Sequence, residues 1–382
     1  MKILIMVHNL TGGGAERVAA LWAEGFVLRG YEVGIVLNCN HKTPMTYKIP
    51  SSVKRYNIAG NHYVNWIANK LYRILGLDIY YIRNLRRVIK DFKPEVAICV
   101  LQPWAEWSRK ASVGMNIKIV NTEHNVFKKP NDAKYNPMTT KLYEEKYVWN
   151  KRYSHVTVLT EVDKRCAEKT LDNVSVLPNP LAFVPCTIIP SKKKVILAVG
   201  RLNAWHVKGF DLLIKSWGRI CLKYPEWKLQ IAGNDRKGAQ QYLQTIADNH
   251  GVGSQLEFLG YRENMLSVYQ DASIFVLSSR YEGFGMVLIE AMSQGCAPIA
   301  CDYEGRQREI ITSDDEGIIC PVEDVNALAE AMKKMIENEI YRKNTQINAI
   351  KRSRYYSIDN IMDKWEEVIE ESCIYNKNSI TK

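Results

Sequence analysis

The sequence has no long hydrophobic run. The apolar stretch at residues 2–7 is short and leads directly into His8 and Asn9, so it has neither the apolar core nor the cleavage site of a signal peptide. The other apolar runs are also far shorter than the ~20 residues that a membrane-spanning helix needs. We therefore expect a cytoplasmic chain that is not an integral membrane protein.

Paired cysteines and metal-ligand spacings are missing too. The nine cysteines are odd in number and form no Cys-x-x-Cys pair, so they are interpreted as reduced thiols. The acidic run Asp314-Asp315-Glu316 precedes Gly317 in a polar loop, which is typical of a turn. We expect neither a metal nor a cofactor.

The sequence also lacks the acidic residue that is typical of a dinucleotide-binding site. Gly12, Gly13 and Gly14 lie between an apolar run and a helical stretch, where backbone amides could approach a phosphate. However, residues 37–40 read Leu-Asn-Cys-Asn, without the acid that holds the ribose of NAD. This argues against NAD, and for the loop alone a simple tight turn is the better interpretation.

Positive charge is plentiful. The formal net charge of +11 favours an anionic partner, which is nucleic acid, a membrane surface or a phosphorylated substrate. One stretch mixes cations with apolar residues as a helix pair at a lipid interface does: Trp66, Ile67, Lys70, Leu71, Arg73, Ile74, Leu75, Ile79, Tyr80, Ile82, Arg83, Arg86, Arg87, Lys90 and Lys93. An ordinary surface helix with a solvated basic face fits equally well, and both interpretations remain open.

Short apolar runs alternate with helical spacing along the chain. The strands expected in the first half are residues 2–7, 31–37, 96–101, 117–121 and 155–160. Those expected in the second half are residues 195–199, 227–232, 256–259, 274–277 and 297–300, with a helix over 209–224. This alternation predicts parallel sheets with helices on both faces.

The length of 382 residues exceeds what one core usually organises. Four prolines between residues 178 and 190 mark a linker. We expect domains over residues 1–184 and 185–356, and a terminal helix and tail over 357–382 that packs back toward the first domain. The predicted fold class is α/β, with two Rossmann-like domains facing a central cleft, where ligands bind beyond the carboxyl ends of the strands.

Two cations flank a strand-to-helix turn at residues 200–209. Arg201 and Lys208 lie there beside flanking glycines, where the helix N-terminus already favours negative charge. The pattern suits a diphosphate better than it suits two solvated surface cations.

Two carboxylates follow another expected strand. Glu282 lies in a turn with Gly283, Phe284 and Gly285, and Glu290 lies about two helical turns later. Because carboxylates repel phosphates but accept hydrogen bonds from vicinal diols, we expect them to bind sugar hydroxyls. A helix surface is the simpler explanation for such spacing, but the Gly-Phe-Gly sequence favours a site.

His124 follows the apolar run that ends at Val120. At the carboxyl end of a strand it can donate a hydrogen bond to a phosphate or to a substrate hydroxyl or carbonyl. A structural role is the safer assumption for an isolated histidine, and the expected cleft position favours a functional one.

Together these segments resemble the retaining glycosyltransferases of family 4, which have the GT-B fold. The resemblance covers most of the chain and rests on the motifs Gly12-Gly-Gly-Ala-Glu-Arg17, Glu123-His124, Asn179-Pro180, Gly200-Arg-Leu202, Lys208-Gly209, Glu282 to Glu290, Ala297-Pro-Ile299 and Glu309-Ile310. The glycine loop and the Glu-His-Asn sequence look most like bacterial members that extend lipid-linked oligosaccharides or surface polysaccharides such as capsule and O-antigen.

The resemblance implies a role for each motif. The first domain would bind the acceptor and the second the nucleotide sugar. Arg201 and Lys208 would bind the donor diphosphate, Glu290 the ribose and Glu282 the donor sugar. The remaining implied site residues are the backbone of Gly283, Phe284, Gly285, Met286 and Val287, His124 beside the transferred sugar, and Gly13 and Gly14 bordering acceptor and phosphate. No metal site is implied.

Residues 303–308 depart from the family pattern. They read Tyr-Glu-Gly-Arg-Gln-Arg where many members have a glycine-rich turn before the Glu309-Ile310 pair. This sequence predicts a difference in donor-sugar specificity or in loop mobility.

The predicted reaction is transfer of a hexose or N-acetylhexosamine from a UDP-sugar to a lipid-linked glycan acceptor, with retention at the anomeric carbon. We expect the enzyme at the inner face of the cell membrane, bound peripherally to anionic lipid and not to nucleic acid. A nucleotide-sugar epimerase or hydrolase of the same fold is the alternative. A non-enzymic protein that binds nucleic acid or membrane is a third hypothesis, prompted by the charge alone.

Overall fold

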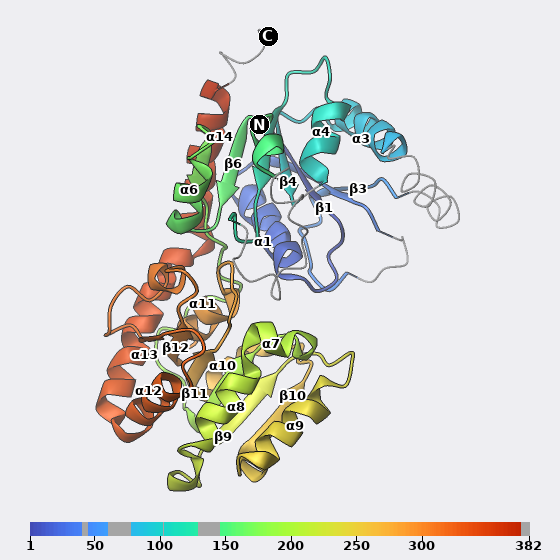
Figure 1. Cartoon of the computed structure of the whole chain (residues 1–382). Helices are drawn as coiled ribbons and strands as arrows, with labels where there is room; N and C mark the ends of the chain where they lie inside the picture. The colour runs from blue at the N-terminus through green and yellow to red at the C-terminus, as the bar shows by residue number, and fades with distance from the viewer. Residues whose placement is uncertain (40–44, 60–77, 102, 129–145, 376–382) are drawn as a thin grey trace. The chain divides into compact units, whose positions relative to one another are not determined.

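The chain forms two compact units (Figure 1), seen in a computed structural model that describes residues 1–39, 45–59, 78–101, 103–128 and 146–375. The first unit is Met1–Pro180 together with Ile358–Lys382, and the second is Leu181–Ser357. The division falls after residue 180 and not after the expected 184, because the amide of Leu181 donates to the carbonyl of Tyr356 (2.7 Å) within the second unit.

The first unit is built on a seven-stranded parallel sheet with the order β3-β2-β1-β4-β5-β6-β7. Its strands are β1 (Lys2–Val7), β2 (Glu32–Leu37), β3 (Lys54–Asn57), β4 (Val96–Val100), β5 (Lys118–Thr122), β6 (His155–Val158) and β7 (Val174–Val176). The inner strands are apolar along most of their length, because both faces of a parallel sheet are covered. The short strands β3 and β7 were not predicted, since few of their residues are buried.

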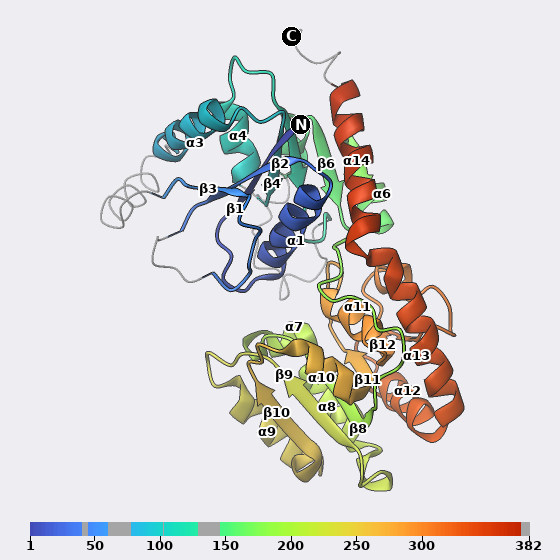
Figure 2. The same cartoon turned by 180° about the vertical axis from the view of Figure 1, so that it is seen from behind.

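The helices of this unit are α1 (Gly14–Leu28), α3 (Ile79–Phe92), α4 (Trp104–Ala111), α6 (Glu161–Ala167) and α14 (Ile358–Tyr375). The last of these comes from the end of the chain and packs against α1, β5 and β6, as its course beside α1 shows (Figure 2). The C-terminal helix is therefore an integral part of the first unit.

Helix α3 carries part of the basic, apolar stretch. Tyr81, Leu85, Ile89 and Phe92 are buried at helical spacing, so this face of α3 lies on the unit's core. The earlier part of the stretch, from Trp66 to Leu75, lies outside the described residues.

The second unit repeats the architecture with a six-stranded parallel sheet in the order β10-β9-β8-β11-β12-β13. Its strands are β8 (Lys193–Val199), β9 (Lys228–Ala232), β10 (Leu256–Gly260), β11 (Ala272–Leu277), β12 (Ala297–Cys301) and β13 (Ile318–Cys320). Its helices are α7 (Trp205–Lys208), α8 (Phe210–Gly218), α9 (Ala239–Asn249), α10 (Met265–Asp271), α11 (Met286–Ser293), α12 (Val325–Glu337) and α13 (Glu339–Ser353). The two sheets confirm the predicted α/β class with Rossmann-like units.

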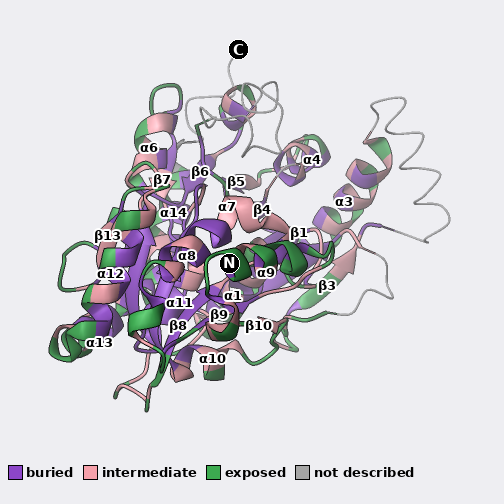
Figure 3. Ribbon diagram, turned by 60° about the horizontal axis from the view of Figure 1, so that its bottom comes forward, coloured by how far each residue is buried: buried purple, intermediate pink, exposed green. Residues whose placement is uncertain are grey.

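The burial pattern agrees with these strands and helices, and one predicted helix boundary was wrong. Many strands are buried, while surface helices such as α12 and α13 expose one side (Figure 3). The helix expected to reach residue 224 ends at Gly218, where a side chain would press against His250. No helix in the described part of the chain is both long and apolar enough to cross a membrane.

Candidate active site

The two predicted donor loops follow neighbouring strands. Strand β8 pairs with both β9 and β11, so the chain order reverses beside β8 and the loops after β8 and β11 leave the same edge of the sheet. In open parallel sheets, ligands bind at such a switch point. The second unit therefore has a single edge at which residues 200–208 and 278–285 meet.

Backbone contacts fix these loops against each other. The amide of Arg280 donates to the carbonyl of Val207 (2.8 Å), and the Ser278 hydroxyl donates to the carbonyl of Lys208 (2.9 Å). Gly209 has a positive φ of 64°, and a Cβ there would overlap the Ser278 carbonyl oxygen. Only glycine allows this close approach.

Lys208 and Glu282 meet across the two loops. Lys208 Nζ lies 2.6 Å from Glu282 Oε2, and the Ser279 hydroxyl donates to the same carboxylate oxygen at 3.2 Å. Both charged side chains are mostly buried. Arg201, by contrast, is exposed and makes no ion pair with any described residue, so its guanidinium is open to a ligand.

A buried arginine braces the loop that carries Glu282. The Arg280 guanidinium bonds both carboxylate oxygens of Asp211 (2.6 and 2.8 Å), the His206 carbonyl (2.7 Å) and Glu323. Burial alone would lower the pKa of Arg280, but the hydrogen bonds to Asp211 and Glu323 raise it above its usual value. Arg280 thus stays charged and ties the loop to α7 and α8.

Glu290 lies in the interior and not on a solvated helix surface. It is 3% exposed, and its Oε2 accepts a hydrogen bond from the Tyr269 hydroxyl at 2.9 Å. Helix α11 begins after Gly285, which has a φ of 96° and offers no side-chain cap. The first amides of this helix, at Met286 and Val287, therefore have no side-chain acceptor from the cap position.

His124 follows β5 in the first unit. Its Nε2 lies 2.9 Å from Thr122 Oγ1, and its Nδ1 is buried and makes no regular hydrogen bond to a described group. Burial lowers the pKa of His124 to about 4, and the nearby Glu123 carboxylate and Asn179 side chain oppose this shift. His124 is therefore neutral at physiological pH. The Nδ1 atom is buried, whereas the residue as a whole is half-buried.

Glu123 has its own buried partners. Its carboxylate pairs with Lys146 at 2.8 Å and accepts hydrogen bonds from Asn121 (3.1 Å) and Asn150 (3.0 Å). These contacts fix the start of the loop that carries His124.

The glycine loop precedes α1 in the same unit. Gly13 is the N-cap of that helix and Gly14 its first residue. A Cβ on Gly13 would overlap the Glu16 carboxylate, which folds back against the helix start. An anion that approaches Gly13 must displace this carboxylate.

Two family models match consecutive parts of the chain. The model described as "Glycosyltransferase Family 4" matches residues 12–183, and the one described as "Glycosyl transferases group 1" matches residues 186–352. The first model covers the glycine loop and His124, and the second covers both predicted donor loops. The chain belongs to the GT-B glycosyltransferases of family 4.

Two relatives of this glycosyltransferase match over almost their whole length. An uncharacterized glycosyltransferase of Haemophilus influenzae is 25% identical over 96% of this chain and 99% of its own. A Campylobacter jejuni alpha-1,4-N-acetyl-D-galactosaminyltransferase is 26% identical over 97% and 99%, and its name specifies a diphospho-undecaprenol-linked GalNAc-GalNAc-diNAcBac acceptor.

Solved structures share the fold of this glycosyltransferase. TarM of S. aureus, crystallised with UDP among other ligands, superposes with a TM-score of 0.77 at 14% identity, covering 96% of this chain and 99% of its own. Anabaena HepE with UDP and glucose gives a TM-score of 0.76 at 16% identity, covering 97% and 99%. These likenesses support the GT-B fold.

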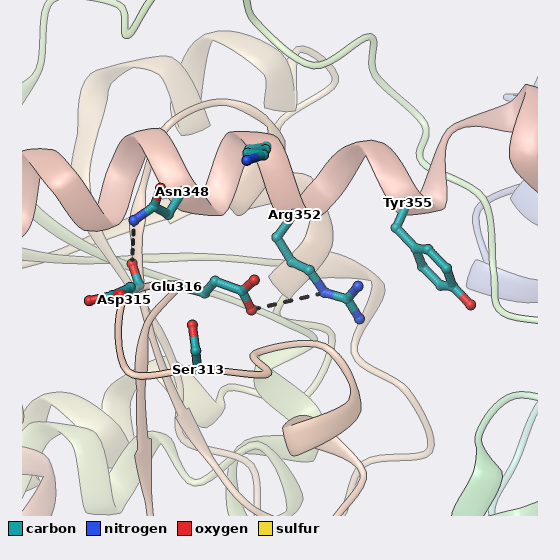
Figure 4. Close-up of a pocket in the computed structure, with 7 residues that line it drawn as sticks. Ser313, Asp315, Glu316, Asn348, Arg352 and Tyr355 are labelled. Carbon is teal, nitrogen blue, oxygen red and sulfur yellow. Dashed lines mark hydrogen bonds and ion pairs between the residues drawn. The ribbon is translucent and has the colours of Figure 1, made fainter.

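A polar pocket of about 380 Å³ lies elsewhere on the second unit of the glycosyltransferase, and none of the predicted donor residues lines it. It is formed by Ser313, Asp315, Glu316, Asn348, Lys351, Arg352 and Tyr355 (Figure 4). Asn348 donates to the Asp315 carbonyl (3.3 Å), and Arg352 lies 4.0 Å from Glu316. Among the described residues, no group of three or more His, Cys, Asp or Glu could hold a metal.

Sequence reasoning did not assign roles to several residues of this site. Asp211, Tyr269, Arg280 and Lys146 hold predicted site residues or their loops in place. Arg280 had one visible signal, since it lies two residues before Glu282 in a turn already singled out. Tyr269 had none, because it lies 21 positions from Glu290 on another helix.

Proposed function

We propose that this glycosyltransferase moves a hexose or N-acetylhexosamine from a UDP-sugar to a lipid-linked glycan, with retention at the anomeric carbon. The observation that carries the proposal is the meeting of Lys208, Glu282 and the start of α11 at one edge of the second sheet. The acceptor class is supported by the diphospho-undecaprenol acceptor in the name of the Campylobacter relative. UDP is supported by its presence in structures of the same fold.

The donor is held by groups of complementary chemistry. Arg201 is exposed with no ion-pair partner among described residues, and the Lys208 ammonium keeps donors beyond the one that faces Glu282, so both can bind the diphosphate. The capless start of α11 adds backbone amides. Glu282 accepts hydrogen bonds from the sugar and Glu290 from the ribose.

Departure of the diphosphate is the step that needs stabilisation. The bond between the anomeric carbon and the phosphate oxygen breaks, and the acceptor hydroxyl oxygen bonds to the same face of that carbon. The hydroxyl proton passes to the leaving diphosphate, so no enzymic nucleophile is required. Arg201, Lys208 and the helix start stabilise the charge that develops. Neutral His124 donates a hydrogen bond to the transferred sugar.

Release of UDP in the presence of acceptor tests this function. UDP formation from a panel of UDP-sugars is measured with and without a polyprenyl-diphosphate-linked glycan. Acceptor-dependent UDP and a lengthened glycan support glycosyl transfer. Equal UDP formation without acceptor indicates a hydrolase, and an isomerised donor without UDP indicates an epimerase.

Charge-removing variants test the site itself. Arg201→Ala and Lys208→Ala should each lower turnover at saturating donor by about 100-fold, the scale for removing one donor to a developing anion. Lys223→Ala removes an exposed cation from the same unit and is the matched control. Near-normal turnover in both site variants contradicts the assignment of charge stabilisation.

The enzyme's place in the cell follows from its acceptor. A lipid-linked acceptor is presented at the inner face of the cell membrane, and the exposed cations of α3 suit an anionic surface there. Peripheral membrane binding is therefore part of the proposal, and nucleic acid is not.

A further inference from the structure

Three aromatic rings connect the C-terminal helix to His124. The Trp22 ring on α1 lies 5.6 Å from the His124 ring, with an interplanar angle of 40°. On α14, Trp365 meets Trp22 edge to face at 4.9 Å and 86°. Both indoles are almost completely buried, and all three residues belong to the first unit.

Packing contributes to the orientation of the imidazole beside its polar contacts. A regular hydrogen bond joins Nε2 to Thr122, and the Asn179 side chain interacts with the ring. The buried Nδ1 has no hydrogen bond of regular geometry to a described residue, so the neighbouring rings help to fix the plane of the imidazole. Trp22 has no anchor of this kind, because its Nε1 is buried without a hydrogen-bond partner among the described residues. The same is true of Trp365 Nε1.

The pairing of α1 with α14 is fixed by independent contacts. Arg29 forms ion pairs with Asp363 (2.6 Å) and Glu366 (2.9 Å). A Cβ on Gly25 would overlap the Met362 side chain, so the two helices approach closely at this point. These contacts set the register of α14 on α1 and hold Trp365 against Trp22.

We propose that Trp365 is a positioning residue for His124: it fixes the Trp22 indole, which in turn holds the imidazole in the orientation that serves glycosyl transfer. The catalytic part of this inference rests on the proposed function. The physical coupling between Trp365 and His124 does not, and it can be measured on the free enzyme.

Loss of the Trp365 ring should release the imidazole. In Trp365→Leu, Trp22 gains room to rotate and water gains access to the His124 ring. The Glu123 carboxylate stays close and continues to favour protonation. The variant therefore loses the fixed orientation of the imidazole but retains the imidazole itself.

Nitrogen NMR of the histidine rings in the full-length enzyme measures the coupling, with the His124 signals assigned by comparison with His124→Gln. In the native enzyme His124 should titrate near 4. In Trp365→Leu its pKa should rise by about one unit or more toward the usual value of 6.5 as water enters. Trp365→Phe keeps an aromatic ring and should restore most of the native titration.

Turnover gives the second readout. Trp365→Leu should lower kcat by about 10-fold or more through misplacement of His124, with an unchanged KM for the nucleotide sugar. Phe92→Leu is the matched control, because it replaces a buried ring by leucine in the same unit, within a core cluster that includes neither Trp22 nor Trp365. This control should keep the native titration and kcat at moderate temperature.

Titration and kcat in Trp365→Leu equal to those of Phe92→Leu would overturn the proposal. If Trp365→Leu does not fold, Trp365→Met decides, since an unchanged His124 titration and kcat in a folded variant that lacks the ring contradict positioning. If the titration of His124 changes in Trp365→Leu but the native enzyme shows no glycosyl transfer, the positioning of His124 by Trp365 is supported and the proposed function is rejected. The positioning role and the proposed function can therefore be rejected independently.

Discussion

Lys208 and Glu282 lie 74 positions apart in the sequence and form an ion pair of 2.6 Å between two neighbouring loops. Lys208 is also predicted to bind phosphate, so phosphate binding by Lys208 and sugar binding by Glu282 are linked. An ammonium group has three N–H donors, and one directed at Glu282 leaves others for a diphosphate. The carboxylate can therefore orient Lys208 while it remains free to accept from a sugar hydroxyl on its other oxygen.

Replacing Glu282 by Gln separates these roles. Loss of its negative charge removes repulsion toward phosphate, so the affinity for UDP in titration calorimetry should stay equal or increase. Glycosyl transfer should nevertheless fall by about 10-fold to 100-fold, because the sugar loses a charged hydrogen-bond acceptor. A parallel loss of UDP affinity and turnover would show instead that Glu282 acts by orienting Lys208.

The Tyr269 hydroxyl should matter for nucleotide binding. It donates to Glu290 at 2.9 Å inside the second unit, so Tyr269→Phe frees the carboxylate that is proposed to bind the ribose. We expect UDP to bind about 10-fold more weakly, with little change in kcat at saturating donor. Tyr224→Phe removes a similar hydroxyl-to-carboxylate bond, to Glu337, and should leave UDP affinity unchanged.

His124 should make stability fall in mild acid. Its pKa is lowered from 6.5 to about 4 in the folded chain by burial. Between these values the unfolded chain takes up a proton that the folded chain does not, so the free energy of unfolding falls as the pH falls through this window. The full loss is roughly 3 kcal/mol. Urea unfolding at pH 7.5 and 4.5 should show a smaller loss for His124→Gln, and equal losses in both proteins would contradict the buried neutral ring.

The cations of α3 should divide into two kinds. Arg83, Arg87 and Lys90 are exposed on one side of the helix, whereas Arg86 donates to the carbonyls of Ala111 (2.7 Å) and Val113 (2.9 Å). Neutralising the exposed three should weaken flotation with anionic liposomes, most clearly at low salt, without a change in melting temperature. Arg86→Gln should lower the melting temperature. Lipid binding that survives the triple substitution places the membrane contact elsewhere.

The unusual sequence at residues 303–308 should influence donor choice. Tyr303 packs against Tyr281 at 5.0 Å, next to Glu282, and the buried Arg306 lies 5.3 Å from the Tyr303 ring. Tyr303→Leu should therefore change the kcat/KM ratio between UDP-hexoses and UDP-N-acetylhexosamines by about 10-fold. UDP affinity should stay constant. A constant ratio together with a uniform loss of activity would assign the loop a purely structural role.

The local sequence was sufficient to predict the fold class and the two loops of the donor site. Apolar runs at β8 and β11 predicted strands, and the glycines and charges after them marked both loops. The partners of the site residues were not visible, because periodicity shows which face of an element is buried but not which distant side chain meets it. Lys208 with Glu282, Glu290 with Tyr269, and His124 with Trp22 all depend on how separate elements pack.

The first unit is assembled from both ends of the chain, and this dictates an order of events during synthesis. Trp22 and Phe26 leave the ribosome early, but Trp365, which packs on both, is made only after the whole of Leu181–Ser357. The second unit is contiguous and can close first. A nascent chain therefore carries an uncovered aromatic surface on α1 until α14 has been made. A premature stop or a proteolytic cut after Ser357 would damage the unit that was translated first.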